Sequence, residues 1–313
     1  MLSRVAERLY WMARDIERAE NTARLVHVYT DTMLDLPKGV GLYWGQLLEI
    51  TGIDEAFGEN YQRAGQGRII KFMLAGEKNP GSLLCSLGAA RENTRTTRDQ
   101  MPSEAWEHIN ELYLFAKKRL ARPISRIRLL EFLSDVVMRC QQIAGLLAGT
   151  MSHGYGYQFV RLGRNLERAD MTTRILDIGS AALLAQEGEV ERLENRLWMN
   201  VLRSLSAYQM YRQNVRRRIR REDVIGYLVQ DVQFPRAVAH SLGEMQVCLE
   251  SLPRNEAALR AVARLQRILA EVEITKLACG GLHEFLDELQ LELAQINEHI
   301  IETWFAPDIH EAV

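Results

Sequence analysis

Apolar residues recur at alternating spacings of three and four positions along most of this chain. The clearest example near the N-terminus comprises Leu9, Met12, Ile16, Ala19, Ala23 and Val26, and it returns 150 residues later at Phe159, Leu162, Leu166, Ala169, Thr173 and Leu176. Such a stripe is typical of a helix that packs one face against other helices. Runs that alternate at period two and are rich in Val, Ile and Thr are absent, so the pattern predicts an all-α protein.

Capping and breaking residues divide the chain into further helices. Asn79 followed by Pro80 predicts an N-cap and a first helical position, for a helix that runs to about residue 98. Ser103 is expected to cap the next helix, and residues 123–125 to begin another that runs to about residue 148. In the second half, the predicted helices span about residues 158–186, 190–219, 235–251, 255–270 and 283–304.

The chain also contains a long internal similarity. The segment R-D-I-E-R-A-E-N-T-A-R-L at 14–25 corresponds to R-N-L-E-R-A-D-M-T-T-R-I at 164–175. Further landmarks correspond in the same order, namely Trp44 with Trp198, Pro80-Gly81 with Pro235-Arg236, and Glu131 with Glu284. Self-similarity at so long a period indicates a duplicated unit. We therefore expect a helical bundle of two tandem repeats, residues 1–150 and 151–313, packed as one unit.

Beside each apolar seam runs a second stripe that is charged at its centre. The candidate binding residues on and beside these stripes are Arg14, Glu17, Arg18 and Arg24, with their counterparts Arg164, Glu167, Arg168 and Arg174. Side chains three or four positions apart on a helix are neighbours, so the first arginine of each stripe is expected to reach the glutamate of the same stripe. A carboxylate on the flank of a packing seam is expected to be half-buried and therefore paired.

Two interpretations of these Glu-Arg elements remain open at this point. They are either ion pairs that fix helix register or join the two halves, or they converge across a pseudo-twofold axis to line a pocket. Paired charges beside a packed seam are more often structural. In a pocket, the arginines would bind an anionic group such as a peptide terminus or an acyl phosphate, because guanidinium holds carboxylate or phosphate with two hydrogen bonds.

Composition and charge restrict the classes of partner that this protein is expected to bind. The formal net charge of −2 gives no electrostatic reason to expect nucleic acid or an anionic membrane. No segment approaches the ~20 apolar residues that span a bilayer, and residues 1–8 carry charges where a signal peptide needs an apolar run. With four scattered cysteines, these features predict a cytoplasmic protein whose thiols are reduced and mostly buried. A basic run at Arg212, Arg216, Arg217, Arg218, Arg220 and Arg221 is most simply a solvated helix end.

No motif of a nucleophilic or cofactor-dependent enzyme occurs in the sequence. The patterns G-x-x-x-x-G-K-[ST], H-E-x-x-H and G-x-S-x-G are all missing, and the seven histidines lack the E-x-x-H spacing of di-iron bundles. We therefore expect no catalytic residue, no cofactor and no metal. Neighbouring arginines would favour the charged form of Glu17 and so lower its pKa, which is the wrong direction for a general base.

The opening M-L-S-R-V-A-E-R-L-Y-W-M-A-R-D-I-E-R-A-E-N-T-A-R resembles the start of the bacterial Alpha-E family. Further similar segments are A-A-R-E-N-T-R at 89–95, R-L-G-R-N-L-E-R-A-D-M-T at 161–172, F-P-R-A-V at 234–238 and G-L-H-E-F-L at 281–286. The resemblance implies a tandemly duplicated helical domain whose Glu-Arg motif falls on Glu17-Arg18 and Glu167-Arg168. Ala237 departs from the Pro-Arg-Ser-Val typical of the family, so no hydroxyl acts at that position.

The resemblance also implies a pathway. Members of that family resemble components of a peptide-synthesis or peptide-modification system, beside circularly permuted ATP-grasp ligases, transglutaminase-like proteins and N-terminal-nucleophile peptidases. We therefore expect a non-catalytic helical partner of an ATP-grasp type ligase, which binds an anionic or peptidyl group through its Glu-Arg elements. The alternatives are an enzyme of the same pathway that uses Glu17 or Glu167 as acid or base, and a purely architectural module.

Overall fold

The computed structural model describes residues 3–35, 43–181 and 190–306. Within these ranges the chain forms helices, turns and loops without a strand, so the all-α prediction is confirmed. The helices of the first half are α1 (Ser3–Asp35), α2 (Gln46–Thr51), α3 (Asp54–Gly58), α4 (Gln66–Ala75), α5 (Leu83–Arg95), α6 (Ser103–Leu120) and α7 (Arg126–Thr150), with a 3-10 turn at η1 (Arg98–Gln100). Those of the second half are α8 (Tyr155–Ala181), α9 (Val190–Ser204), α10 (Tyr208–Val215), α11 (Arg221–Gln230), α12 (Val238–Glu250), α13 (Glu256–Glu271), α14 (Ile274–Cys279) and α15 (Leu282–Trp304).

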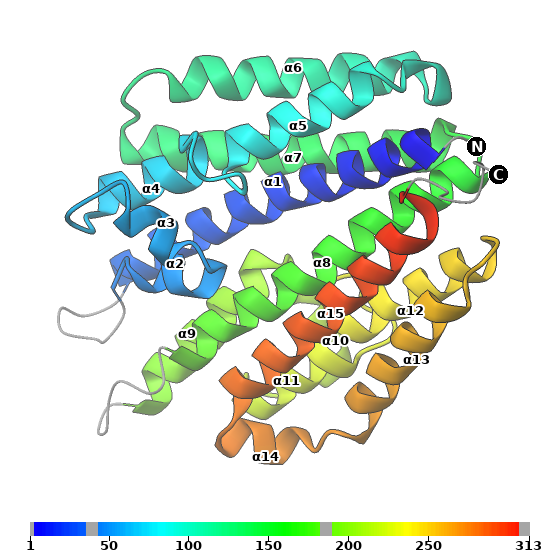
Figure 1. Ribbon diagram of the computed structural model, residues 1–313. Helices are drawn as coiled ribbons and strands as arrows, with labels where there is room; N and C mark the ends of the chain where they lie inside the picture. Colours follow the sequence, from blue (N-terminus) through cyan, green and yellow to red (C-terminus); the bar gives the residue numbers. More distant parts are fainter. Residues whose placement is uncertain (1–2, 36–42, 182–189, 307–313) are drawn as a thin grey trace.

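Two long helices, α1 and α8, form the centre of the molecule. They lie side by side and run in the same general direction (Figure 1). Helix α1 packs against α5 and α7, and α8 packs against α12 and α15. In turn, α6 packs on α5 and α7, while α13 packs on α12 and α15. Helices at corresponding places in the two halves therefore make corresponding contacts.

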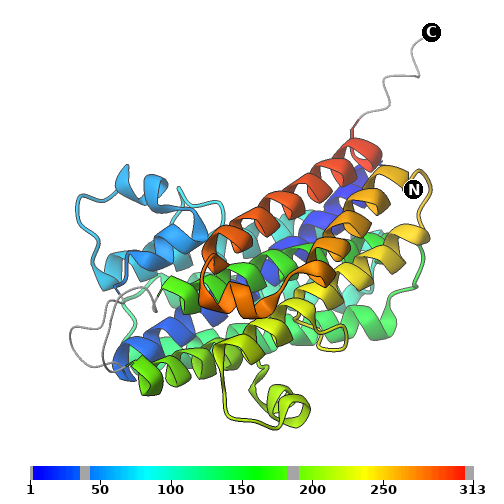
Figure 2. The ribbon, with the colours of Figure 1, turned by 90° about the horizontal axis from the view of Figure 1, so that it is seen from below.

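The shorter helices α2 to α4 gather at the end of the bundle away from the N-terminus of α1 (Figure 2). Helix α2 contacts α8 of the other half, just as α9 contacts α1. In the part of the chain that the structure describes, no helix combines the length and the apolar character needed to cross a membrane.

The apolar seams predicted for α1 and α8 are buried along their whole length. Every residue of the two stripes that open the sequence analysis is at most 7% exposed. The two helices also approach each other closely at one point, where a Cβ on Gly163 would lie 2.3 Å from the carbonyl oxygen of Tyr10. A glycine is therefore required there for the helices to pack at this distance.

Two predicted helices differ substantially from the observed ones, and α6 has Pro102 rather than the expected Ser103 at its N-cap position. The helix expected from Asn79 begins instead at Leu83, and Ser82 is its N-cap, with its hydroxyl accepting from the amide of Cys85 at 3.3 Å. The Asn79 side chain accepts from the Gly81 amide and donates to the Phe72 carbonyl, so these residues form a turn. Asn is favoured in turns for the same reason as at N-caps, since its side chain bonds nearby backbone groups.

The helix predicted over 190–219 is likewise divided into α9 and α10. Ser206 has a φ of 53°, and the Ala207 amide donates to the Leu202 carbonyl at 2.7 Å, which closes the end of α9. The chain then turns into α10. Helices α2, α3, α4, α11 and α14 were not predicted, and residues 182–186 of the predicted helix over 158–186 lie outside the described residues.

Candidate functional site

The two Glu-Arg motifs contact each other across the α1–α8 interface. Arg168 donates to both oxygens of Glu17, with Nε–Oε1 at 2.9 Å and Nη2–Oε2 at 2.8 Å. Arg18 donates to both oxygens of Glu167 in the same way, at 2.6 and 2.9 Å. Each motif thus supplies the carboxylate of one pair and the guanidinium of the other. This reciprocal, two-bond pairing joins the two helices.

Both glutamates are enclosed more fully than the sequence predicted. Glu17 is 3% exposed and Glu167 is 1% exposed, so they are buried rather than half-buried. Burial by itself would raise the pKa of Glu17, but the charges of Arg168 and Arg236 outweigh it and lower the pKa to about 2. Burial is outweighed at Glu167 too, where the charges of Arg14 and Arg18 lower the pKa. Neither carboxylate is suited to take up a proton as a general base at neutral pH.

The first arginine of each stripe does not bond as predicted. Arg14 reaches Glu167 on the other helix instead of Glu17, with its Nε 2.9 Å from Oε2, and its Nη1 donates to Asn297 on α15 at 2.7 Å. The Nε of Arg164 is buried and has no hydrogen-bond partner among the described residues. Burial, together with the charge of Arg168, lowers the pKa of Arg164. For Arg14 the i,i+3 prediction failed because its carboxylate partner lies on the neighbouring helix.

The last arginine of each stripe binds a carboxylate four positions earlier and one backbone carbonyl of the other half. Arg24 pairs with Glu20 and donates to the Ser204 carbonyl at the end of α9 at 3.1 Å. Arg174 pairs with Asp170 and donates to the Ile50 carbonyl in α2 at 3.0 Å. These two arginines therefore attach α9 to α1 and α2 to α8.

Arg236 is a site residue that the sequence reasoning missed. It precedes α12 and lies 8% exposed against α1, where Nη1 donates to Glu17 Oε1 at 3.2 Å and to Asn21 Oδ1 at 3.1 Å. Its Nη2 donates to Glu20. Burial lowers the pKa of Arg236, although the charges of Glu17 and Glu20 oppose this. The available signal was its place in the internal similarity, opposite Gly81.

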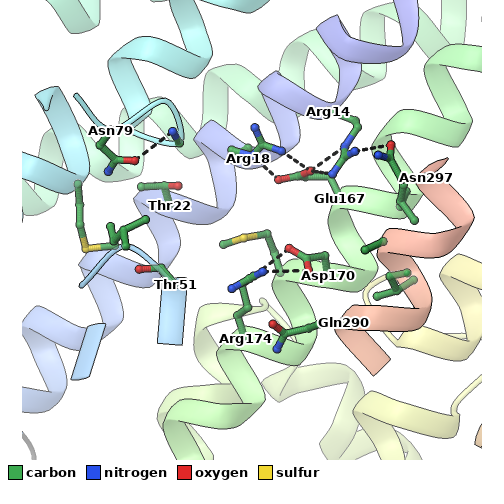
Figure 3. Close-up of a pocket in the computed structure, with 17 residues that line it drawn as sticks. Arg14, Arg18, Thr22, Thr51, Asn79, Glu167, Asp170, Arg174, Gln290 and Asn297 are labelled. Carbon is green, nitrogen blue, oxygen red and sulfur yellow. Dashed lines mark hydrogen bonds and ion pairs between the residues drawn. The ribbon is translucent and has the colours of Figure 1, made fainter. Parts of the chain in front are cut away.

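A cavity of about 360 Å³ opens beside the second of these ion-pair clusters. Figure 3 shows Arg14 and Arg18 directed at Glu167 on one side, and Asp170 with Arg174 on another. The remaining polar lining residues are Thr22, Thr51, Asn79, Gln290 and Asn297, and the apolar ones include Ile53, Met73, Leu166, Met171 and Leu293. Its walls therefore come from α1, α4, α8 and α15, from the end of α2 and the segment after it, and from the turn before α5.

The cavity brings together only part of the predicted site. Arg14, Arg18, Glu167 and Arg174 line it, whereas Glu17, Arg24, Arg164 and Arg168 do not. The side chains of Arg18, Asp170 and Arg174 are 25%, 21% and 23% exposed, so the charged part of the cavity reaches solvent. Among its described lining residues there is no cysteine, serine, histidine or lysine. The arginines and carboxylates of this lining are suited to binding a charged group.

A separate cluster could in principle hold a metal ion. Asp177, His283 and Asp287 each place a donor atom within 4.8 Å of the others. His283 Nδ1 lies 3.0 Å from both oxygens of Asp177, and this contact raises the pKa of the histidine. His283 thus already pairs with Asp177, and its Nε2 lies 3.6 Å from Asp287 Oδ2.

Comparison with known proteins is consistent with this helical arrangement. A family model described as a predicted alpha-helical domain with a conserved ER motif matches residues 1–305. An uncharacterized protein of Mycobacterium bovis and one of Mycobacterium tuberculosis are each 25% identical over 316 residues, which covers 91% of this chain and 34% of theirs. The chain thus spans about a third of the length of the curated relatives it matches. No solved structure matches it.

Proposed function

The chain belongs to the Alpha-E family, and we propose that it is a non-catalytic, helical component of a peptide or amide-bond synthesis or modification system. In this proposal it binds an anionic or peptidyl group and acts with a circularly permuted ATP-grasp ligase, with a transglutaminase-like protein as a further partner. The partners are inferred from the family resemblance of the sequence. The binding role is inferred from the cavity beside Glu167.

The observation that carries the binding role is the charge pattern of this cavity. Three arginines and two carboxylates line one space that is open to solvent. Arginines hold a carboxylate or an acyl phosphate through paired hydrogen bonds, and carboxylates accept an amine or a guanidinium. A peptide or an amino acid carries both kinds of group, so it complements such a lining at both ends.

We also propose that the chain consists of two tandem repeats, residues 1–150 and 151–313, whose Glu-Arg motifs join them. The same contacts α1–α5–α7 and α8–α12–α15 in each half, and the reciprocal pairing of the motifs, support this division. Removing one partner of a buried ion pair costs about 3–5 kcal/mol. The motif residues accordingly hold the fold together, and the cavity beside them binds the ligand.

Reconstitution with the ligase tests the proposed function. We expect the chain to co-elute with a circularly permuted ATP-grasp ligase from the same source and to change its rate of ADP release. A variant that combines Asp170→Asn and Arg174→Gln should still co-elute but should lose most of that change. The matched control combines Arg161→Gln and Glu244→Gln, which removes another ion pair of α8 outside the cavity.

An architectural role is the second candidate, and one observation favours it. Both motif glutamates form two-bond ion pairs within the chain, so neither requires a ligand to balance its charge. If the cavity variant and the control variant behave like the wild type in ligase binding and ADP release, the architectural role is the correct one.

A further inference from the structure

The turns that precede α5 and α12 are alike, but one carries glycine where the other carries arginine. The Ser82 amide donates to the Asn79 carbonyl at 2.9 Å, and the Ala237 amide donates to the Phe234 carbonyl at the same distance. Ser82 and Ala237 are the N-caps of their helices. The residues between these anchors are Pro80-Gly81 in one turn and Pro235-Arg236 in the other. Gly81 therefore occupies the backbone position of Arg236.

The groups that hold the Arg236 guanidinium have counterparts in the cavity. Arg236 donates to Glu17, Glu20 and Asn21 on α1. The residues 150 positions later on α8 are Glu167, Asp170 and Met171, and all three line the cavity together with Gly81. The cavity thus lies where an arginine side chain at position 81 would place its guanidinium.

The two carboxylates in the cavity have room for a further donor. Glu17 Oε1 accepts from Arg168, Asn21 and Arg236. At Glu167, Oε2 accepts from Arg14 and Arg18, but Oε1 accepts from Arg18 alone among the described contacts, so the room for a donor is at Oε1. Glu20 accepts from both Arg24 and Arg236, whereas its counterpart accepts from Arg174 alone. An ionised carboxylate can accept about four hydrogen bonds.

The surrounding positive charge does not exclude a cation. Arg14, Arg18 and Arg174 border the cavity, and their counterparts Arg164, Arg168 and Arg24 lie near Glu17 or Arg236 in the other half. The same set of charges therefore already accommodates one guanidinium in this protein. Asp170 takes the place of Glu20 in the cavity. Its side chain is one methylene shorter, which leaves additional space for a ligand.

We propose that this cavity binds the guanidinium of an arginyl ligand, which occupies the place that Arg236 fills in the other half. The proposal rests on the proposed function, in which the cavity holds a peptidyl group, and it assigns the chemistry of that group. The guanidinium donates to Asp170 and to Glu167 Oε1 from its two Nη atoms, as Arg236 does to Glu20 and Glu17. A single ammonium cannot bridge both acceptors with the same planar geometry.

Calorimetric titration with three blocked amino acids tests the assignment. The probes are the N-acetyl, C-terminal N-methylamide derivatives of arginine, citrulline and lysine. Citrulline has the shape of arginine without its charge, and lysine has the charge without the planar fork. We expect the arginine derivative to bind at least about tenfold more tightly than either of the others. Equal affinity for citrulline or lysine, or no binding of the arginine derivative, overturns the proposal.

Substitutions at the cavity provide a second test of the proposal. Gly81→Arg should place a guanidinium of the chain itself in the cavity and abolish binding of the arginine probe. A Cβ at this position lies 3.4 Å from Asn79 Oδ1, so the backbone accepts a side chain with little strain. Gly65→Arg is the control, because Gly65 is exposed and a Cβ there meets nothing within 4 Å. Asp170→Asn should lower the affinity for the arginine probe without filling the cavity, so the test remains valid if Gly81→Arg fails to fold.

The outcomes separate this proposal from the proposed function. Suppose that N-acetylglutamate binds, that Gly81→Arg prevents this binding, and that the arginine probe does not bind. The cavity is then a peptidyl site that prefers a negatively charged ligand, and only the guanidinium assignment fails. If the arginine probe binds as expected but the ligase reconstitution shows no effect, the guanidinium assignment holds and the proposed pathway fails.

Discussion

At the scale of single residues, the charges buried between α1 and α8 have a large effect on stability. We expect Glu17→Gln to lower the free energy of unfolding by about 3–5 kcal/mol at neutral pH, because it leaves Arg168 and Arg236 buried without their carboxylate. Urea denaturation followed by circular dichroism measures this change. Glu92→Gln is the control, since its pair with Arg95 is about half exposed, and it should change stability little.

The same variant has a defined pH dependence. Glu17 in the folded protein has a pKa of about 2, which lies below its ordinary value of 4.5. Its contribution to stability is therefore fully present above pH 4.5 and is lost as the pH falls toward 2. The difference in stability between the wild type and Glu17→Gln should shrink over this interval. A difference that stays constant down to pH 2 would contradict the assignment of the stabilisation to the ionised carboxylate.

Asp15 is a buried carboxylate whose pKa is shifted in the opposite direction from that of Glu17. Burial raises its pKa to about 7, and its Oδ1 lies 3.8 Å from Arg18 Nη1. Because the folded-state pKa lies above the ordinary value of 3.8, the wild type loses stability as the pH rises from 3.8 to 7. Asp15→Asn avoids this loss, so it should be more stable than the wild type by up to about 4 kcal/mol at pH 8 and similar to it at pH 4.

Asn165, the counterpart of Asp15 on α8, supplies the reverse substitution. Its side-chain amide donates to the Arg161 carbonyl at 3.0 Å, a contact that a carboxylate cannot make. Asn165→Asp should therefore introduce a new loss of stability at high pH. Thermal melts of the two variants between pH 4 and pH 8 check both signs. Parallel pH profiles for the wild type and Asp15→Asn would refute the prediction.

At the scale of helices, the closest approach of α1 and α8 depends on one missing side chain. A Cβ on Gly163 would overlap the Tyr10 carbonyl, so Gly163→Ala should lower stability by about 1–3 kcal/mol or more, the usual cost of overpacking. Gly145→Ala in α7 is the control, because a Cβ there meets nothing within 4 Å. It should raise stability by about 0.5–1 kcal/mol. Chemical denaturation distinguishes the two; equal effects would contradict the close packing.

Most of the helices could be predicted from sequence, and the exceptions have local causes. Long amphipathic helices such as α1, α8 and α15 can be recognised from the repeated spacing of their apolar residues. Helices α2, α3 and α14 have six residues or fewer, which is too short for such a period to be recognised. The division between α9 and α10 depends on Ser206 with positive φ, and no glycine or proline marks that position.

For the candidate site, the sequence predicted some of the residues that belong to it but not the contacts that these residues make. The internal sequence similarity singled out Glu17 and Glu167, but the arginine partner of each lies on the other helix, and helical spacing alone cannot reveal an interhelical contact. Arg236 was overlooked because it stands in a loop some 220 residues away from its acceptor Glu17. Its place in the internal similarity, opposite Gly81, was the available signal.

At the scale of the whole molecule, the two halves are expected to depend on each other for folding. Each half presents its motif glutamate and arginine to the other, so separation exposes unpaired charges beside the apolar seam of α1 or α8. The polypeptides 1–150 and 151–313 should be poorly folded when produced singly, and should co-purify when produced together. Combined Arg18→Ala and Arg168→Ala substitutions should prevent this association. Cooperative thermal unfolding of either half alone would contradict the expectation.

The cavity beside Glu167 takes its walls from segments that lie far apart along the chain, on α1, α8 and α15. Whatever binds there recognises only the native state, so ligand concentration and thermal denaturation are thermodynamically linked. A ligand at about a thousand times its Kd raises the free energy of unfolding by about 4 kcal/mol. Screening a library of amino acids and short peptides by melting temperature can therefore identify the physiological ligand before any reaction is known.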